Sequence, residues 1–185
     1  MPVNAPNNNL GWKAPDFKLL SVDGNNYSLN DLIGKRGTVV VFICNHCPYV
    51  IKIAKRLSFE AVELKKIDIS LISIMSNDVN SYPDDSFENM KIFAQKYNFN
   101  FPYLYDSTQE IAKKYKAICT PDFFGFDKNL NLQYRGRIDS GVINSNNNDI
   151  KRELFYAMEQ IANTNETPKI QNNSFGCAIK WKTNE

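Results

Sequence analysis

The chain of 185 residues lacks the features that mark several other classes of protein. Its formal net charge is only +2, and its basic residues form no block, so nothing in the charge indicates nucleic acid as a partner. No apolar run approaches the roughly 18 residues that a membrane-spanning helix needs. The N-terminus also lacks the basic and apolar regions of a secretory leader. We therefore expect a cytoplasmic protein that binds neither membrane nor nucleic acid.

The chain also has only four cysteines, fewer than small secreted proteins that are stabilised by several disulfides. With 43% hydrophobic residues it can bury a core without disulfide staples. We predict an irregular arm over residues 1–13, one domain over 14–165 and a polar tail over 166–185. Phe175 and Trp181 suggest that this tail docks on the domain.

Hydrophobic periodicity predicts strands that alternate with helices. The predicted strands lie at 17–22, 27–29, 38–44, 69–75, 101–105, 122–126 and 132–137. The predicted helices lie at 30–33, 50–64, 87–97 and 150–161, and a further helix is opened by a capping box at 107–110 and runs through about residue 115. This order predicts an α/β fold with a mixed central sheet, helices on both faces, an N-terminal β-hairpin and an antiparallel edge at the end.

Two cysteines, Cys44 and Cys47, lie where a buried strand gives way to a helix, and the only histidine, His46, lies between them. A helix N-terminus favours negative charge, and a Cys-x-x-Cys pair in this position has a lowered thiol pKa. We expect the thiolate on Cys44, with His46 stabilising it further and making the disulfide more oxidising. In a reducing cytoplasm such a pair is more often catalytic or metal-binding than structural.

A metal site is the main alternative reading of this cluster. Structural zinc usually takes four ligands from two knuckles, whereas this chain has one knuckle and two isolated cysteines, Cys119 and Cys177. We therefore expect a redox dithiol with no metal and no organic cofactor. A non-catalytic metal-binding or adaptor module stays open as an alternative.

A second landmark, Thr120-Pro121, precedes a predicted strand. Proline is confined to strand starts and edges, and X-Pro bonds are the main site of cis peptides, so we predict a cis bond here. That loop would then approach the dithiol and bring Cys119 close to Cys44. Cys119 is either an additional redox thiol or a small buried apolar residue. Cys177, in the tail, is a weaker candidate for a resolving thiol.

The residues APDFKL at 14–19, the hairpin SVDGNNYSL, the CNHC motif at 44–47 and Thr120-Pro121 together resemble the thioredoxin-like superfamily. Within it they resemble the branch of thiol-disulfide reductases and peroxiredoxin-like proteins of the AhpC/TSA type. The resemblance implies that Cys44 is the nucleophile, that Cys47 resolves the mixed disulfide, and that cis Pro121 faces the dithiol. It also implies that the backbone of Thr120 pairs with a bound substrate chain.

Two departures from these relatives shape the functional prediction. Thioredoxin has Gly-Pro between its cysteines, where this chain has Asn45 and His46, so we expect a shifted redox potential. The peroxiredoxin array P-x-x-x-T-x-x-C, aligned on Cys47, has Val40 and Cys44 in place of its proline and threonine. We predict a thiol-disulfide oxidoreductase acting on protein or small-molecule disulfides with a thiol or disulfide electron donor. A thiol-dependent peroxidase is the second candidate.

Overall fold

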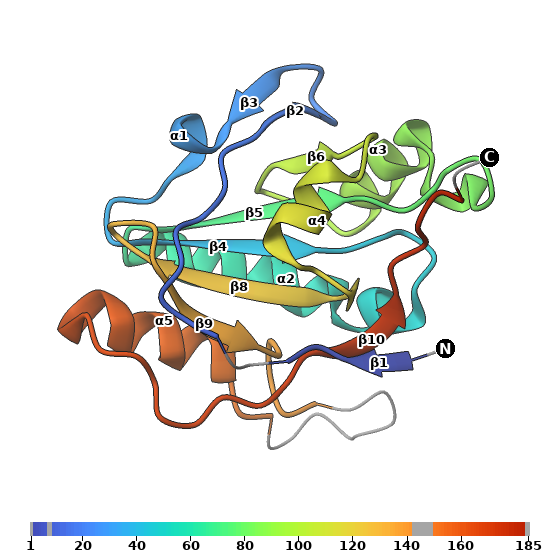
Figure 1. The fold of residues 1–185 in the computed structure, drawn as a ribbon. Coiled ribbons are helices and arrows are strands. Elements are labelled where there is room, and N and C mark those ends of the chain that lie inside the picture. The colour runs from blue at the N-terminus through green and yellow to red at the C-terminus, as the bar shows by residue number, and fades with distance from the viewer. Residues whose placement is uncertain (1, 7–8, 142–149, 184–185) are drawn as a thin grey trace.

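The computed structural model describes residues 2–6, 9–141 and 150–183. Within these residues, one sheet has seven strands in the order β3-β2-β6-β5-β4-β8-β9, and a second has three in the order β1-β10-β7 (Figure 1). The strands are β1 (Pro2–Asn4), β2 (Lys18–Ser21), β3 (Asn26–Ser28), β4 (Gly37–Phe42), β5 (Ile69–Met75), β6 (Tyr103–Tyr105), β7 (Cys119–Thr120), β8 (Asp122–Asp127), β9 (Leu132–Gly136) and β10 (Phe175–Ala178). The helices are α1 (Leu29–Leu32), α2 (Pro48–Lys66), the 3₁₀ turn η1 (Pro83–Asp85), α3 (Phe87–Lys96), α4 (Glu110–Tyr115) and α5 (Glu153–Thr164).

Strand β4 lies inside the larger sheet, with a strand on either side. It pairs in parallel with β5 and antiparallel with β8, and all six of its residues are buried. Its β-branched run, with no polar alternation, is what a strand covered on both faces requires. The predicted mixed sheet with an antiparallel edge is confirmed, because β8 and β9 pair antiparallel at one side.

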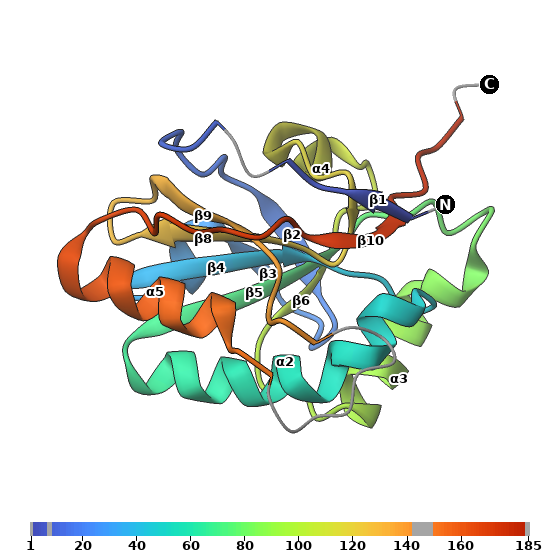
Figure 2. The same cartoon turned by 90° about the horizontal axis from the view of Figure 1, so that it is seen from below.

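Alternate side chains of β4 enter two separate cores. Val39 and Val41 face the core formed with α2, α3 and α5, whereas Val40 and Phe42 face the core formed with α4. Figure 2 shows α2, α3 and α5 on one side of the sheet and α4 on the other. The period of two along a strand therefore produces the predicted thioredoxin-like α/β layers.

The predicted capping box at residues 107–110 is wrong. Helix α4 begins at Glu110 after Gln109, which has a φ of 64° and makes no side-chain cap. The buried carboxylate of Asp106 accepts instead from the N–H groups of Ile111 and Ala112, the latter at 2.9 Å. A residue outside the four-residue pattern thus satisfies the free donors of the first turn.

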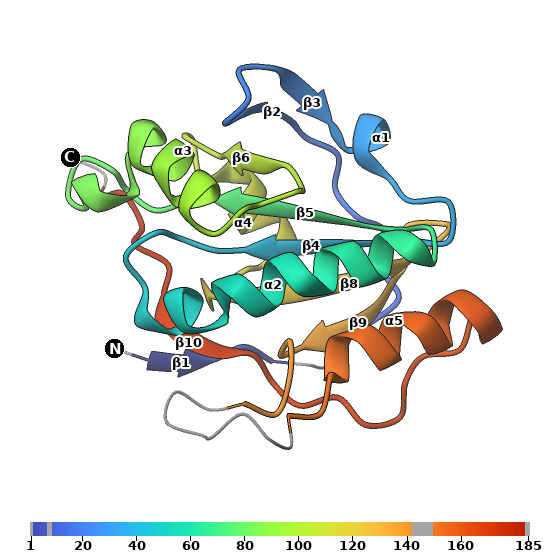
Figure 3. The same ribbon diagram turned by 180° about the vertical axis from the view of Figure 1, so that it is seen from behind.

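Both chain ends contain a β-strand, where the sequence had predicted an irregular arm and a polar tail. The predicted arm contains β1, and β10 of the tail lies between β1 and β7, antiparallel to both. Figure 3 shows these strands beside the start of α2. Among the residues described, no helix is both long and apolar enough to span a membrane.

Candidate active site

The two cysteines of the CNHC motif lie in the turn from β4 into α2. Cys44 lies two residues after the end of β4, and Cys47 is the N-cap of α2 with Pro48 at the first helical position. Both are almost fully buried, with exposed fractions of 1% and 0%. Pro48 suits this position because its missing N–H is not needed there. The helix N-terminus therefore lies directly at Cys47 and three residues away from Cys44.

Thr120 contacts both thiols from the other side of the site. Its Oγ1 lies 3.3 Å from Sγ of Cys44, and its carbonyl oxygen lies 3.2 Å from Sγ of Cys47. The Thr120-Pro121 bond is cis, which confirms the prediction from the sequence. The loop before β8 and the turn before α2, some seventy residues apart in the chain, thus meet at the dithiol.

The two thiols form a coupled pair in which Cys47 is the more acidic partner. A hydrogen bond from Cys44, helped by the Val50 N–H and by the thiol and N–H of Cys177, lowers the pKa of Cys47 to about 5 against the opposing effect of burial. The hydrogen bond to Cys47, burial and the nearby Asp85 carboxylate hold the pKa of Cys44 well above its ordinary value. The shifts of the pair thus favour the charge on Cys47, whereas the sequence led us to expect it on Cys44, and the interaction between the two thiols is their largest cause.

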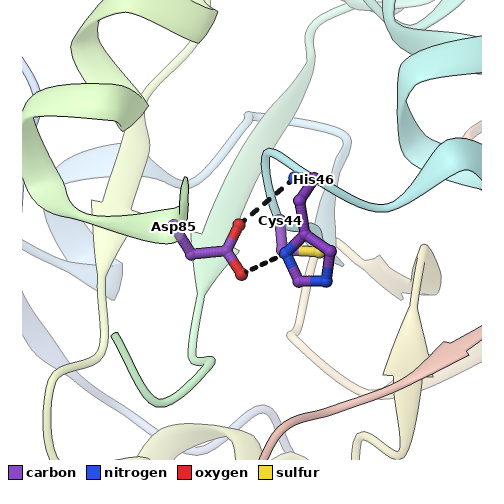
Figure 4. A group of neighbouring side chains, drawn as sticks. All are labelled: Cys44, His46 and Asp85. Atoms are coloured by element: carbon purple, nitrogen blue, oxygen red, sulfur yellow. Dashed lines mark hydrogen bonds and ion pairs between the residues drawn. The ribbon is translucent and has the colours of Figure 1, made fainter. Parts of the chain in front are cut away.

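His46 is held by a buried carboxylate that sequence reasoning missed. Its Nδ1 donates to Asp85 Oδ2 at 2.7 Å (Figure 4). Its ring stacks on Tyr82, with the planes 10° apart. Because a carboxylate only accepts, this bond leaves the imidazole Nε2 free of a proton in the neutral ring. His46 is about a quarter exposed, whereas Asp85 is fully buried.

Asp85 also holds the backbone of the CNHC turn. It accepts from the N–H of Asn45 at 2.7 Å, from the N–H of His46 at 3.3 Å and from Nδ2 of Asn77 at 2.8 Å. Tyr103 donates to the side-chain oxygen of Asn45. No short-range pattern marks Asp85, since it lies 39 residues beyond His46 and reaches the site only through the packing of η1.

Cys44, His46 and Asp85 each offer one ligand atom, and these atoms lie within 4.8 Å of one another. This is the single such cluster among the residues the structure describes. However, His46 and Asp85 already bond to each other, and Asp85 has three further donors. A metal ion would have to displace those bonds, so the geometry suits a hydrogen-bonded dyad beside a thiol better than a tetrahedral metal centre.

Of the two remaining cysteines, Cys177 lies on β10 opposite Thr120, whereas Cys119 bonds to the cis-proline loop itself. Cys119 is buried, its thiol donates to the carbonyl of Pro121 at 3.5 Å, and burial raises its pKa. Cys177 is half-buried, and burial together with a hydrogen bond to Cys47 raises its pKa to about 11. The sequence had favoured the opposite ranking of these two thiols.

The backbone of Thr120 does not offer the open edge that the resemblance implied for a substrate chain. Strand β10 already pairs with it, in the register Cys177 opposite Thr120. A protein substrate could pair there only after β10 moved away, because both backbone groups of that edge face the chain's own C-terminal strand.

A cavity of about 450 Å³ lies against Pro121 and is open to solvent. Aromatic rings of Tyr49, Phe123 and Phe175 contribute to its lining, and Lys52 and Arg56 of α2 lie at the same cavity. Mixed apolar and polar lining is usual for a small-molecule site. The cavity reaches Pro121 of the cis-proline loop, but neither Cys44 nor Cys47 is among the residues that line it.

Comparison with solved structures finds close matches over the whole chain. An uncharacterized conserved protein from Geobacillus kaustophilus is 41% identical, with a TM-score of 0.92, covering 100% of this chain and 98% of its own. A hypothetical protein from Sinorhizobium meliloti is 32% identical, with a TM-score of 0.91, covering 98% and 99%. A secreted disulfide oxidoreductase of Mycobacterium tuberculosis has a TM-score of 0.58 at 22% identity, covering 77% of this chain and 94% of its own, a likeness of fold alone.

Sequence comparison gives the family. A curated protein of Coxiella burnetii, "Putative peroxiredoxin bcp", is 27% identical over 116 residues, which cover 63% of this chain and 72% of that protein. The model of the AhpC/TSA family matches residues 10–135, more than half of the chain, and this span includes β4, the CNHC turn and the cis-proline loop. The chain therefore belongs to the AhpC/TSA family.

Proposed function

We propose that this protein is a thiol-disulfide oxidoreductase that cycles Cys44 and Cys47 between dithiol and disulfide. One observation carries the proposal: the two thiols lie together in the turn from β4 into α2, where both contact Thr120 of the cis-proline loop, Cys44 at 3.3 Å from Oγ1 and Cys47 at 3.2 Å from the carbonyl oxygen. A thiolate is the nucleophile in disulfide exchange, and its partner within bonding reach is the natural resolving group.

In the first step, the Cys47 thiolate attacks one sulfur of a substrate disulfide. The Cys47–substrate disulfide forms, and the other half of the substrate leaves as a thiolate that takes up a proton. Cys44 then loses its proton and attacks the Cys47 sulfur. This forms the Cys44–Cys47 disulfide and expels the second substrate thiol. The roles reverse the assignment made from the resemblance, because the charge favours Cys47 as the attacking sulfur.

We propose His46 as the acceptor of the Cys44 proton, because one ring nitrogen lies within 4.8 Å of the Cys44 sulfur. Its Nδ1 donates to Asp85, so the free Nε2 is the basic atom of the neutral ring. The Oγ1 of Thr120 lies against the same sulfur and lowers the pKa of Cys44, partly offsetting Asp85. We assign His46 and Thr120 as the residues that tune Cys44, and Pro121 as the residue that places Thr120.

Both sulfurs are covered in this conformation, so a substrate disulfide reaches them only when a neighbouring element moves. The cavity beside Pro121 fits the part of the substrate that does not react. A small disulfide suits this site better than a folded protein, since β10 occupies the strand edge at Thr120. A cellular thiol would return the disulfide to the dithiol, in the cytoplasm that the sequence predicts.

Thiol-dependent peroxide reduction is the second candidate, and the acidic thiolate of Cys47 before Pro48 favours it. The thiolate would attack peroxide, form a sulfenate and release water, after which Cys44 would condense with the sulfenate to the same disulfide. Against it, Val40 is a buried aliphatic residue of β4, and Cys44 stands where the peroxiredoxin array has threonine.

The test is equilibration of the purified protein with glutathione at a series of redox ratios, with free thiols counted at each ratio. A reversible two-electron couple that Cys44→Ser and Cys47→Ser each abolish supports the proposal, and Cys119→Ser is the matched control that should leave it intact. If the wild-type protein forms no reversible Cys44–Cys47 disulfide, the proposal fails. Consumption of hydrogen peroxide with a dithiol donor, lost in Cys47→Ser, would select the peroxidase instead.

A further inference from the structure

We infer that Cys177 of β10 is a third redox thiol, which takes Cys47 out of the Cys44–Cys47 disulfide and presents the resulting Cys47–Cys177 disulfide to an external thiol. The inference rests on the proposed function and adds to it the route by which the buried pair is reduced.

The first support is the register of the C-terminal strand. Cys177 lies directly opposite Thr120, the residue that contacts Cys44 through Oγ1 and Cys47 through its carbonyl. Cys177 also packs against the core that contains both Cys44 and Cys47, and its thiol and N–H contribute to the lowered pKa of Cys47. A third sulfur therefore lies against Cys47, on a strand 130 residues further along the chain.

The second support is the glycine beside it. A Cβ on Gly176 would lie 2.0 Å from the carbonyl oxygen of Thr120 and 3.0 Å from Cδ of Pro121. Real Cβ atoms do not approach backbone oxygen this closely, so a larger residue would hold β10 away from the cis-proline loop. Gly176 allows the close approach that brings Cys177 to the dithiol.

The third support is the anchoring of the strand at both ends. On one side, the Phe175 ring meets Tyr49 of α2 at a centroid distance of 5.0 Å. On the other, the Ile179 N–H donates to the carbonyl of Ile118 at 3.0 Å, and the Lys180 N–H donates to Asn77 Oδ1 at 2.9 Å. Cys177 is thus held in place within an otherwise polar C-terminal segment.

The exchange balances without an external oxidant. The Cys177 thiolate attacks the Cys47 sulfur of the Cys44–Cys47 disulfide, so the Cys47–Cys177 bond forms and the Cys44–Cys47 bond breaks. Cys44 leaves as a thiolate and takes up the proton that Cys177 lost. Once Cys47 is in a disulfide it has no charge, which removes a cause of the raised pKa of Cys177 and makes this attack easier.

The second exchange uses the difference in exposure among the three sulfurs. Cys44 and Cys47 are buried, whereas Cys177 is half-buried, so an external thiol reaches Cys177 first. Attack there forms a mixed disulfide on Cys177 and expels Cys47 as a thiolate. Cys47 is the best leaving group of the three because its thiol is the most acidic. A second external thiol then releases Cys177 and leaves as a disulfide.

Cys119 offers a matched comparison. It is adjacent to Thr120 on β7, and neighbouring residues of a strand point to opposite faces. Its thiol donates to Pro121 rather than to either active-site sulfur. We therefore expect Cys119 to stay reduced throughout the cycle.

The decisive experiment traps the second disulfide. Cys44→Ser protein, which has three cysteines left of the four, is oxidised with diamide, which takes two electrons and two protons from a thiol pair. Tryptic peptides are then mapped by mass spectrometry. We expect peptide 37–52, which carries Cys47, joined to peptide 170–180, which carries Cys177, with one free thiol left on peptide 117–128.

The matched control is Cys44→Ser combined with Cys119→Ser, which should crosslink equally well. A protein that instead joins Cys47 to Cys119, or forms no intramolecular bond at Cys47, overturns the inference. In either case, a reversible Cys44–Cys47 disulfide in the wild-type protein would leave the proposed function standing. If the wild-type protein forms no reversible Cys44–Cys47 disulfide, the proposed function itself is wrong.

A rate measurement tests the route itself. The oxidised wild-type protein and oxidised Cys177→Ser are mixed with excess glutathione, and the return of free thiols is followed. We expect reduction to slow by about tenfold or more in Cys177→Ser, because the external thiol must then reach a buried sulfur. Equal rates in the two proteins would overturn the role of Cys177 as the point of entry.

Discussion

Two segments close over the dithiol from opposite sides, and they differ in kind. The loop between β5 and α3, residues 76–86, brings Asn77, Tyr82 and Asp85 to the side of Cys44 and His46. The C-terminal strand β10 brings Gly176 and Cys177 to the side of Cys47. The loop supplies the buried carboxylate of Asp85 and hydrogen-bond partners. The strand supplies the thiol of Cys177 and covers the backbone edge of Thr120.

The interaction between the two thiols is the largest cause of their opposite pKa shifts, and the two sides add to it. Asp85 contributes to the raised pKa of Cys44, while the Val50 N–H and Cys177 of β10 contribute to the lowered pKa of Cys47. Asn77 joins the two sides, since its Nδ2 donates to Asp85 and its Oδ1 accepts from the N–H of Lys180. The effect of a substitution in the loop can therefore be compared with the effect of a substitution in β10.

The largest effect is expected from the loop side. Asp85→Ala removes the acceptor of four hydrogen bonds and leaves buried donors unpaired, so we expect a loss of about 3–5 kcal/mol of unfolding free energy. Denaturation in urea measures it. The neighbouring Asp84→Ala is the control, because that side chain is exposed and only its backbone carbonyl contacts Asn45. Equal stability of the two variants would contradict the assigned role.

The acidity of Cys47 is the next largest difference between the sides. With a pKa of about 5 against an ordinary value of 9.0, Cys47 should be almost wholly thiolate at neutral pH, where an ordinary thiol is ionised to roughly 1%. Ultraviolet absorbance of the thiolate during a pH titration measures this fraction. In Cys44→Ala the midpoint should move upward, because the largest stabilising hydrogen bond is gone.

The same pair makes stability depend on pH with a definite sign. The folded pKa of Cys47 lies below its ordinary value, so its contribution is full above about pH 9, falls with decreasing pH and is lost below about pH 5. The raised pKa of Cys44 acts in the opposite direction above pH 9. Urea midpoints should therefore rise from pH 5 toward 9, and this rise should shrink in Cys47→Ser.

On the strand side, Gly176→Ala should cost about 2 kcal/mol, since the added methyl group meets the Thr120 carbonyl at 2.0 Å and β10 must shift. The shift should also speed the alkylation of Cys47, whereas Asn173→Ala, at an exposed position of the same segment, should change neither quantity. Unchanged stability together with unchanged alkylation would show that the close approach of β10 is not needed.

The smallest effect is expected where the two sides meet. Thr120→Val keeps the shape of the side chain but removes the hydroxyl 3.3 Å from Cys44, at a cost of about 1 kcal/mol. Because that hydrogen bond lowers the pKa of Cys44, its loss should move the second thiol titration to higher pH. A downward shift would mean that the hydroxyl does not stabilise the Cys44 thiolate.

Several features could be predicted from the sequence because they depend on neighbours in the chain. The β-branched run before Cys44 and the apolar stripe after Cys47 specify a buried strand and a helix, and so the turn that holds the dithiol. The proline after Thr120 specified the second side of the site. The prediction at residues 107–110 failed because a capping pattern shows only that a residue is able to cap a helix. In the folded chain, the carboxylate of Asp106 accepts from the first-turn N–H groups instead.

The sequence by itself determined the layered α/β fold, the position of Cys44 and Cys47 in a strand-to-helix turn, and the cis bond near them, since short-range periodicity and residue chemistry specify each of these. Only the tertiary structure brought Asp85 to His46, Thr120 to both thiols, and Cys177 of β10 opposite Thr120. The physical reason is that these properties depend on charges and hydrogen bonds between segments 39 to 130 residues apart, which meet only when the sheet and its helices pack.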